Sequence, residues 1–141
     1  GATDASILGD LLLGMARNCG VVAAVTDGLV RDVPGIEAVG IPVYARGLSP
    51  NSPFKNGPGE IGLPIAIGNL AVSPGDIVLG DRDGVVVVPL PRAREVIEAL
   101  SGIKVKEAKM EAAVAGGLRN PDWLAGVLDS DRVRYLDGDD R

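Results

Sequence analysis

The stretch VVAAVTDGLVRDVPGIEAVGIPVYA, residues 21–45, decides the fold that we predict. Its first part, Val21–Thr26, is a short apolar, β-branched run typical of a buried parallel strand. Asp27-Gly28 ends this run, and a short helix is expected over Pro34–Val39, because proline suits a first helical turn. A second buried strand is expected over Ile41–Ala45. Since a strand, a helix and a strand follow in order, we expect the two strands to be parallel.

Upstream of this stretch, apolar residues at helical spacing predict a helix over Ser6–Asn18. Gly20 is expected to stop it. On this interpretation the chain opens with a helix, and no earlier strand anchors the sheet. We therefore expect that an N-terminal segment is missing or is carried separately.

Downstream, residues 49–59 are rich in Pro, Gly, Asn and Ser and are expected to form a loop. Four short apolar runs separated by turn signals then predict antiparallel strands: Ile61–Ile67, Leu70–Val72, Ile77–Leu79 and Val85–Val88. A long helix is expected from Pro91 to about Val114, followed by a C-terminal tail over 117–141 that is frayed or docked on a neighbour. The sequence thus predicts one α/β domain over 1–141, with a mixed sheet flanked by helices.

The composition excludes several kinds of catalytic site. The 141 residues include no histidine, so a Ser-His-Asp or Cys-His arrangement within one chain is excluded, as are the usual zinc sites. A metal ion would need oxygen ligands, which favours magnesium, manganese or calcium. Proton transfer would fall to a carboxylate, Lys, Tyr or a metal-associated water.

The charge and hydropathy of the chain limit its partners. The net charge is −5 and no cluster of Lys and Arg exists, which argues against nucleic acid. No apolar run has transmembrane length, so we expect a cytoplasmic protein that does not bind membranes. The single cysteine, Cys19, excludes an internal disulfide and is expected to be a small buried apolar residue rather than a nucleophile.

Three charged residues are candidates for chemistry. Asp10 lies near the start of the first predicted helix, and Arg31 and Asp32 follow the first predicted strand. Ligands of α/β folds bind where strands end and helices begin, so the backbone amides of Gly9–Leu12 are suited to a carboxylate. Asp32 is suited to a hard cation, and Arg31 to a second negative charge or a developing enolate oxygen. Alternatively, Arg31 and Asp32 form an exposed turn pair and Asp10 only decorates a helix.

The order and spacing of these residues favour the functional alternative. Twenty residues separate Asp10 from Arg31-Asp32, and this pattern resembles the signature of the RraA-like family of 4-hydroxy-4-methyl-2-oxoglutarate aldolases, the class II pyruvate aldolases. The resemblance runs from about Gly1 to about Ala113. It includes the segments Gly9–Leu12, Val25–Asp32, Pro42–Gly47, Lys55–Gly59, Pro74–Asp76 and Gly80–Pro89.

The resemblance implies a swivelling β/β/α fold, a ring-shaped homotrimer or a hexamer of two stacked rings, and a role for each site residue. Asp32 matches the ligand of a divalent cation, Mg²⁺ or Mn²⁺, and Arg31 matches the residue that contacts a small 2-oxo acid substrate and steadies its enolate. Gly9, Asp10, Leu11 and Leu12 match the segment that receives the substrate carboxylate, and Asp10 also matches a carboxylate near the water of the metal. A glutamate from the C-terminal helix of an adjacent subunit completes the family's site; Glu107 is our choice, with Glu111 as the alternative.

Two other functions stay open at this point. RraA-type proteins that bind and regulate ribonuclease E share the fold and keep much of the motif, and a structural subunit without activity is a third possibility. Family members are also longer, with a preceding segment of helices and a strand.

The glycines at 9, 14 and 20 do not form a dinucleotide fingerprint, because their spacing is wrong and no strand is expected before them. Asp76, Asp81 and Asp83 lack the full calcium-loop pattern and are expected to be turn residues.

Overall fold

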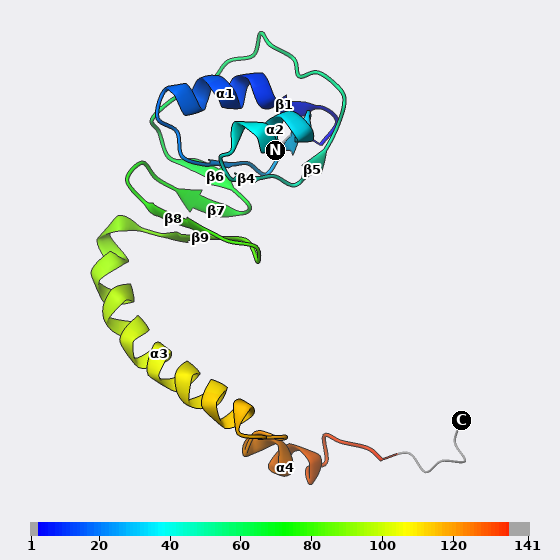
Figure 1. Ribbon diagram of the computed structural model, residues 1–141, viewed down its shortest axis with the longest axis vertical. Coiled ribbons are helices and arrows are strands. Elements are labelled where there is room, and N and C mark those ends of the chain that lie inside the picture. The colour runs from blue at the N-terminus through cyan, green and yellow to red at the C-terminus, as the bar shows by residue number, and fades with distance from the viewer. Residues whose placement is uncertain (1–2, 136–141) are drawn as a thin grey trace. The chain divides into compact units, whose positions relative to one another are not determined.

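The computed structural model describes residues 3–135, shown in Figure 1. Their contacts divide the chain into two compact units, one that ends at Arg94 and one that begins at Glu95, and each is described by itself. The first unit alternates strands and helices and then continues in hairpins, so the predicted α/β class is confirmed. The single domain predicted over 1–141 stays a prediction.

The first half of this unit contains two helices and two small parallel sheets. The helices are α1 (Asp10–Asn18) and α2 (Val33–Val39). One sheet has the order β1-β3-β5 and the other pairs β2 with β4; their bounds are Ser6–Leu8, Leu29–Val30, Gly47–Leu48, Ala24–Val25 and Val43–Tyr44. The predicted parallel pair is β2 and β4, in which Ala24 lies opposite Val43, and it is confirmed.

The predicted start of the first helix was wrong, because Ser6–Leu8 forms strand β1 and α1 begins only at Asp10. Ser6 is completely buried, and both its amide and its hydroxyl donate to the carbonyl of Asn51, at 3.0 and 2.8 Å. Pairing with β3 and these long-range bonds outweigh the local helical spacing. The expectation that no strand precedes the first helix is therefore wrong as well.

The C-terminus of α1 explains why the predicted strand over Val21–Thr26 is shorter than expected. Gly20 is in the left-handed region at φ 87° and its amide donates to the carbonyl of Arg17, while the amide of Val21 donates to the carbonyl of Ala16. This is the Schellman arrangement, which satisfies the last carbonyls of a helix. Gly20 stops the helix as predicted, but the cap uses Val21, and β2 spans only Ala24–Val25.

The second half of the unit consists of two antiparallel hairpins, as predicted. They pair β6 (Ile65–Ile67) with β7 (Leu70–Val72), and β8 (Ile77–Gly80) with β9 (Val85–Val88). Gly68 and Asn69 both have positive φ, which is what a tight two-residue hairpin turn requires. The parallel and antiparallel strands form four separate small sheets, whereas we had expected one mixed sheet.

A small apolar core fixes the two helices against the parallel strands. Leu13 of α1, Val30 of β3 and Ile36 of α2 are buried, and five partly buried side chains pack on them: Leu8, Ala24, Val39, Ile41 and Val43. Arg17 also donates from Nη1 to the carbonyl of Val39 at 2.6 Å, which joins the C-terminal ends of the two helices. Because α1 begins shortly after β1 ends, and α2 shortly after β3 ends, the first turns of both helices lie beside the ends of these strands.

The second unit is helical. A short 3₁₀ turn, η1 (Leu90–Arg92), leads into α3 (Ala93–Ala115), which matches the long helix predicted from Pro91 to about Val114. A further helix, α4 (Trp123–Leu128), lies in the region that we expected to be a tail. Part of that tail, 136–141, lies outside the described residues. Within residues 3–135 no helix has both the length and the apolar character needed to span a membrane.

Candidate active site

Asp10 opens α1 directly after Gly9, which has an extended backbone at φ −145°. The Asp10 carboxylate accepts a hydrogen bond from the amide of Leu11 at 2.7 Å, through Oδ1. A negative charge is favourable at this end of a helix. Of the four amides that we expected to receive a substrate carboxylate, the Leu11 amide is thus already engaged, while the first turn of a helix leaves amides such as those of Asp10 and Leu12 without helical acceptors.

Arg31 and Asp32 connect β3 to α2. The Arg31 amide donates to the carbonyl of Leu8 at 3.2 Å and so extends the pairing of β3 with β1. Asp32 is the N-cap of α2 and adopts the left-handed conformation, with φ 62° and ψ 45°. A residue other than glycine is uncommon in this conformation, and such strained positions cluster at functional sites.

The side chains of this pair contact each other and remain accessible. Arg31 Nε lies 3.2 Å from Asp32 Oδ2, and the two side chains are 36% and 49% exposed. Arg31 Nη1 also donates to the hydroxyl of Ser52 at 2.7 Å. An ion pair that is half open to solvent is free to meet a ligand, and it contributes little to stability by itself.

Two glycines allow the charged groups to approach the backbone. A Cβ atom on Gly9 would lie 2.8 Å from Asp32 Oδ2 and 3.2 Å from Arg31 Cγ. A Cβ atom on Gly35, in α2, would overlap the Asp10 carboxylate. The structure thus brings Arg31 and Asp32 against Gly9, the neighbour of Asp10, and packs Asp10 against the helix that Asp32 caps.

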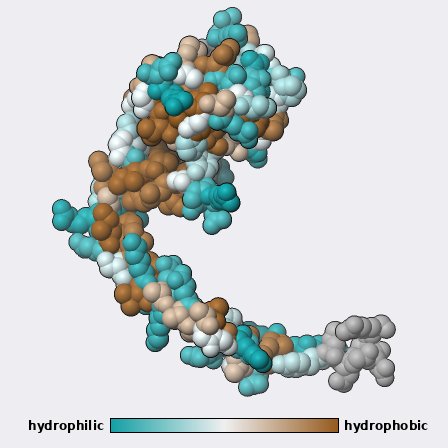
Figure 2. All heavy atoms as spheres, viewed as in Figure 1, coloured by the Kyte–Doolittle hydropathy of each residue, from teal (hydrophilic) through white to brown (hydrophobic). Residues whose placement is uncertain are grey.

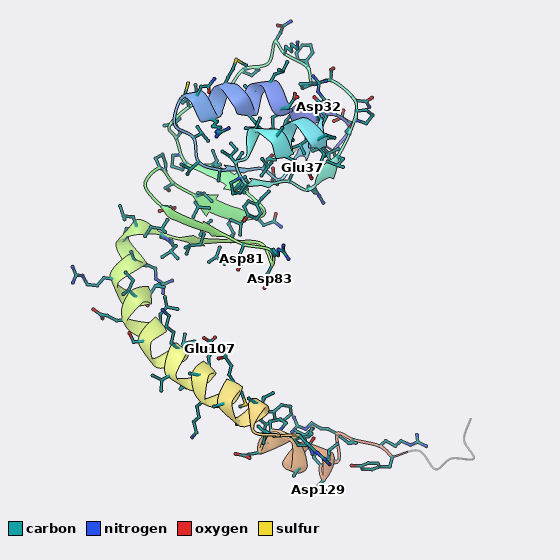
Figure 3. The ribbon with its side chains drawn as sticks, viewed as in Figure 1. Asp32, Glu37, Asp81, Asp83, Glu107 and Asp129 are labelled. Atoms are coloured by element: carbon teal, nitrogen blue, oxygen red, sulfur yellow. The ribbon has the colours of Figure 1, made fainter. Side chains whose placement is uncertain are left out.

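A shallow, open hollow of about 410 Å³ adjoins the pair. Its lining combines Arg31 and Asp32 with residues of three neighbouring segments: Val30, Val33, Leu48, Ser49 and Pro50. Figure 3 shows Asp32 beside the start of α2. The sequence singled out Asp10, Arg31 and Asp32, and their roles stay a prediction; it did not point to Gly35 and Ser52, because close approach and long-range hydrogen bonds leave no local pattern.

The donor atoms fit a hard divalent cation that keeps most of its water. Asp32 offers a half-exposed carboxylate, and the described residues contain no group of three or more His, Cys, Asp or Glu side chains that could enclose an ion. Mg²⁺ is commonly held by one or two carboxylates together with several waters, and Mn²⁺ also suits oxygen ligands. A sparse oxygen site of this kind therefore suits those ions better than calcium or zinc.

The predicted glutamates belong to the second unit. Glu107 and Glu111 lie on α3 with exposed side chains, and Figure 3 labels Glu107 along that helix. We expected them to act on an adjacent subunit, so their role stays a prediction.

The other candidates have outcomes of their own. Cys19 is exposed, so the prediction that it is buried was wrong; it is the C-cap of α1 and lies at the end of the helix. Asp76 accepts from the amides of Ser73 and Leu90, and Asp81 accepts from those of Asp83 and Gly84, which confirms that both are turn residues. Strand β1 precedes Gly9 after all, although the glycine spacing still differs from a dinucleotide fingerprint.

The geometry defines an α/β protein with an Arg-Asp pair held over the start of a helix. The model of the RraA-like family, described as Aldolase/RraA, matches residues 1–87, and the chain belongs to this family. The family and the RraA-like fold implied by the sequence are thereby confirmed.

Individual relatives agree with this assignment. A protein of Halalkalibacterium halodurans bears the provisional name 4-hydroxy-4-methyl-2-oxoglutarate aldolase. It is 34% identical to this chain, and the match covers 78% of this chain and 52% of the relative. The crystal structure of Streptomyces coelicolor RraAS2, described as an unusual member of the RNase ES inhibitor RraA protein family, has a TM-score of 0.71 at 30% identity, over 79% of this chain and 57% of that one. The RNA-processing inhibitor RraA from a Thermus species has a TM-score of 0.59 at 31% identity, over 63% and 54%. The chain therefore spans about half the length of these relatives.

Proposed function

We propose that this chain carries a divalent-metal-dependent lyase site that releases pyruvate from 4-hydroxy-4-methyl-2-oxo acids and decarboxylates oxaloacetate. The observation that carries the proposal is the accessible Arg31–Asp32 pair, 3.2 Å apart, packed against Gly9 at the start of α1. The Arg31 guanidinium, the carboxylates of Asp10 and Asp32, and the first amides of α1 then lie together where strands β1 and β3 end. The name of the Halalkalibacterium halodurans relative supports this substrate class.

Asp32 is the residue that would hold the metal, Mg²⁺ or Mn²⁺. When bound, the ion supplies a Lewis acid that polarises the keto group of a 2-oxo acid. Arg31 adds a fixed positive charge for the oxygen on which negative charge develops, and the amides of Asp10 and Leu12 bind the substrate carboxylate.

The reaction that these residues serve is a retro-aldol cleavage. The C4 hydroxyl of 4-hydroxy-4-methyl-2-oxoglutarate loses its proton, the C3–C4 bond breaks, and the electron pair of that bond passes into the enolate of pyruvate. The enolate then takes a proton at C3, so that two pyruvates leave. Asp10, whose Oδ1 is already held by the Leu11 amide, is the carboxylate that orients the water for these proton transfers.

The proposed site also includes a second copy of the chain. Glu107, or Glu111 in its place, would reach the site from the α3 helix of an adjacent subunit in a homotrimer or hexamer. The exposure of both side chains on α3 is compatible with this role.

The test is pyruvate release with and without Mg²⁺ in the parent chain and in Asp32→Ala. We expect the variant to lose metal-stimulated turnover and to keep its circular dichroism spectrum, because a half-exposed side chain contributes little to packing. Asp83→Ala removes an exposed turn carboxylate in the same unit and should leave turnover unchanged. Magnesium-dependent activity retained by Asp32→Ala would contradict the proposal.

The alternative function is an RraA-type regulator that binds ribonuclease E without a catalytic role. The two solved relatives described as inhibitors favour it. A chain that slows RNA cleavage by ribonuclease E, yet releases no pyruvate with any divalent metal, would establish the regulator and exclude the lyase.

A further inference from the structure

Arg31 is held by a second partner, Ser52, 21 positions along the chain. The Nη1–Oγ distance of 2.7 Å is shorter than the 3.2 Å between Arg31 Nε and Asp32 Oδ2. Nε and Nη1 are thus both engaged, and Nη2 has no hydrogen-bond partner within residues 3–135. The guanidinium therefore offers a defined nitrogen to a ligand and does not turn freely about its long side chain.

The segment that carries Ser52 is anchored to the core of the sheet. The buried Ser6 binds the Asn51 carbonyl through its amide and its hydroxyl, and the Asn51 amide donates to the hydroxyl of Ser49 at 3.2 Å. The Ser49 amide donates in turn to the carbonyl of Val30 at 3.0 Å, and the Asn51 side chain donates to the carbonyl of Asp4 at 3.0 Å. Ser52 follows directly on this network, so its position relative to β1 and β3 is fixed.

We propose that Ser52 is a positioning residue, whose hydroxyl holds the Arg31 guanidinium in the orientation that leaves Nη2 for the substrate. This inference rests on the proposed lyase function. An isolated hydrogen bond at an exposed serine would contribute little, because the hydroxyl would move with a free loop. Here both ends are fixed: Arg31 through its amide bond to Leu8, and Ser52 through the anchored segment before it. A fixed donor costs no reorganisation as charge develops.

The kinetic test compares Ser52→Ala with Ser52→Thr, which keeps a hydroxyl, and with Ser73→Ala, which removes an exposed hydroxyl elsewhere in the same unit. We expect Ser52→Ala to lower kcat for oxaloacetate roughly 3- to 10-fold, within the range for an ordinary hydrogen bond, because this one is exposed. Ser52→Thr should recover most of this loss and Ser73→Ala should match the parent. In the Arg31→Lys background, Ser52→Ala should have almost no further effect, because residues that act through one another are not additive.

Several results would overturn the inference and leave the lyase intact. They are a Ser52→Ala chain within twofold of the parent in kcat, an equal loss in the Ser52→Thr chain, or the same loss in both backgrounds, which would indicate general destabilisation. A parent chain that releases no pyruvate, or an Arg31→Lys chain at the parental rate, would contradict the proposed function itself.

A measurement that does not depend on turnover then decides the role of Ser52. The Arg31 Nε–H resonance can be assigned in a ¹H–¹⁵N spectrum as the signal that Arg31→Lys removes. Ser52→Ala should shift this signal and speed rotation of the guanidinium, while Ser52→Thr and Ser73→Ala should leave it in place. An Arg31 signal that is the same in Ser52→Ala and in the parent would overturn the positioning role.

Discussion

Two of the hollows in the first unit differ in size and chemistry. The larger, about 900 Å³, lies between the β2–β4 pair and the two hairpins, and its lining is mostly aliphatic. Figure 2 shows hydrophobic residues gathered over these hairpins, where Ile65, Leu70 and Val86 are exposed. The smaller, about 410 Å³, adjoins Arg31 and Asp32. The largest apolar pocket is the usual first candidate for a ligand site, but of these two hollows only the smaller has in its lining an ion pair and an Asp in the left-handed conformation. The chemistry of the lining, and not the volume, is the reason why we place the proposed site at the smaller hollow.

The largest effect is expected when the same substitution, Arg to Lys, is made in the lining of each hollow and the two losses of turnover are compared. Arg31→Lys should lower kcat for oxaloacetate on the order of 10²–10³-fold, because lysine keeps the charge but loses the planar fork of donors. Arg46→Lys makes the same change in the lining of the larger cleft and should stay within about twofold. Steady-state kinetics at saturating magnesium measure both. Equal losses of kcat in the two variants, or a loss only in Arg46→Lys, would contradict the placement of the site at the smaller hollow.

A smaller effect is expected from a single methyl group at Gly9. Its extended backbone accepts alanine, but the new Cβ would lie 2.8 Å from Asp32 Oδ2, so the carboxylate has to move. Gly9→Ala should therefore weaken the activation of turnover by Mg²⁺ about tenfold, the lower end of what supporting residues contribute to metal sites. Titration of activity with Mg²⁺ measures the change. An unaltered magnesium requirement would show that the position of Asp32 is not critical.

The smallest effect is expected at Gly14, and it is of opposite sign. This glycine lies inside α1, where a Cβ would meet only Val39 Cγ2, at 3.9 Å. Gly14→Ala should raise the free energy of unfolding by about 0.5–1 kcal/mol, because alanine loses less backbone entropy in a helix. Thermal unfolding checks this, and turnover should not change. A lower midpoint would mean that α1 packs more tightly on α2 than the 3.9 Å contact indicates.

The sequence predicted elements whose signals are local. The hairpins follow from turn residues such as Gly68-Asn69, and α3 follows from 23 residues of helical spacing. Strands β3 and β5 have two residues each, too few for any periodicity, and they exist because they pair with neighbours far along the chain. The same distinction applies to the site. Asp10, Arg31 and Asp32 were predicted from their spacing, whereas Ser52 is a candidate only because of a hydrogen bond across 21 positions.

The backbone at Asp32 restricts which residue this position accepts, independently of any reaction. The left-handed conformation at φ 62° is least costly for Gly; among the other residues, Asn and Asp tolerate it better than longer or branched side chains. In the proposed site this residue also supplies an anionic oxygen to the metal. Aspartate is the only one of the twenty side chains that meets both requirements, since asparagine lacks the charge and glutamate lacks the conformational tolerance. An exchange of acid for acid, Asp32→Glu, is thus a non-conservative change at this point of the chain.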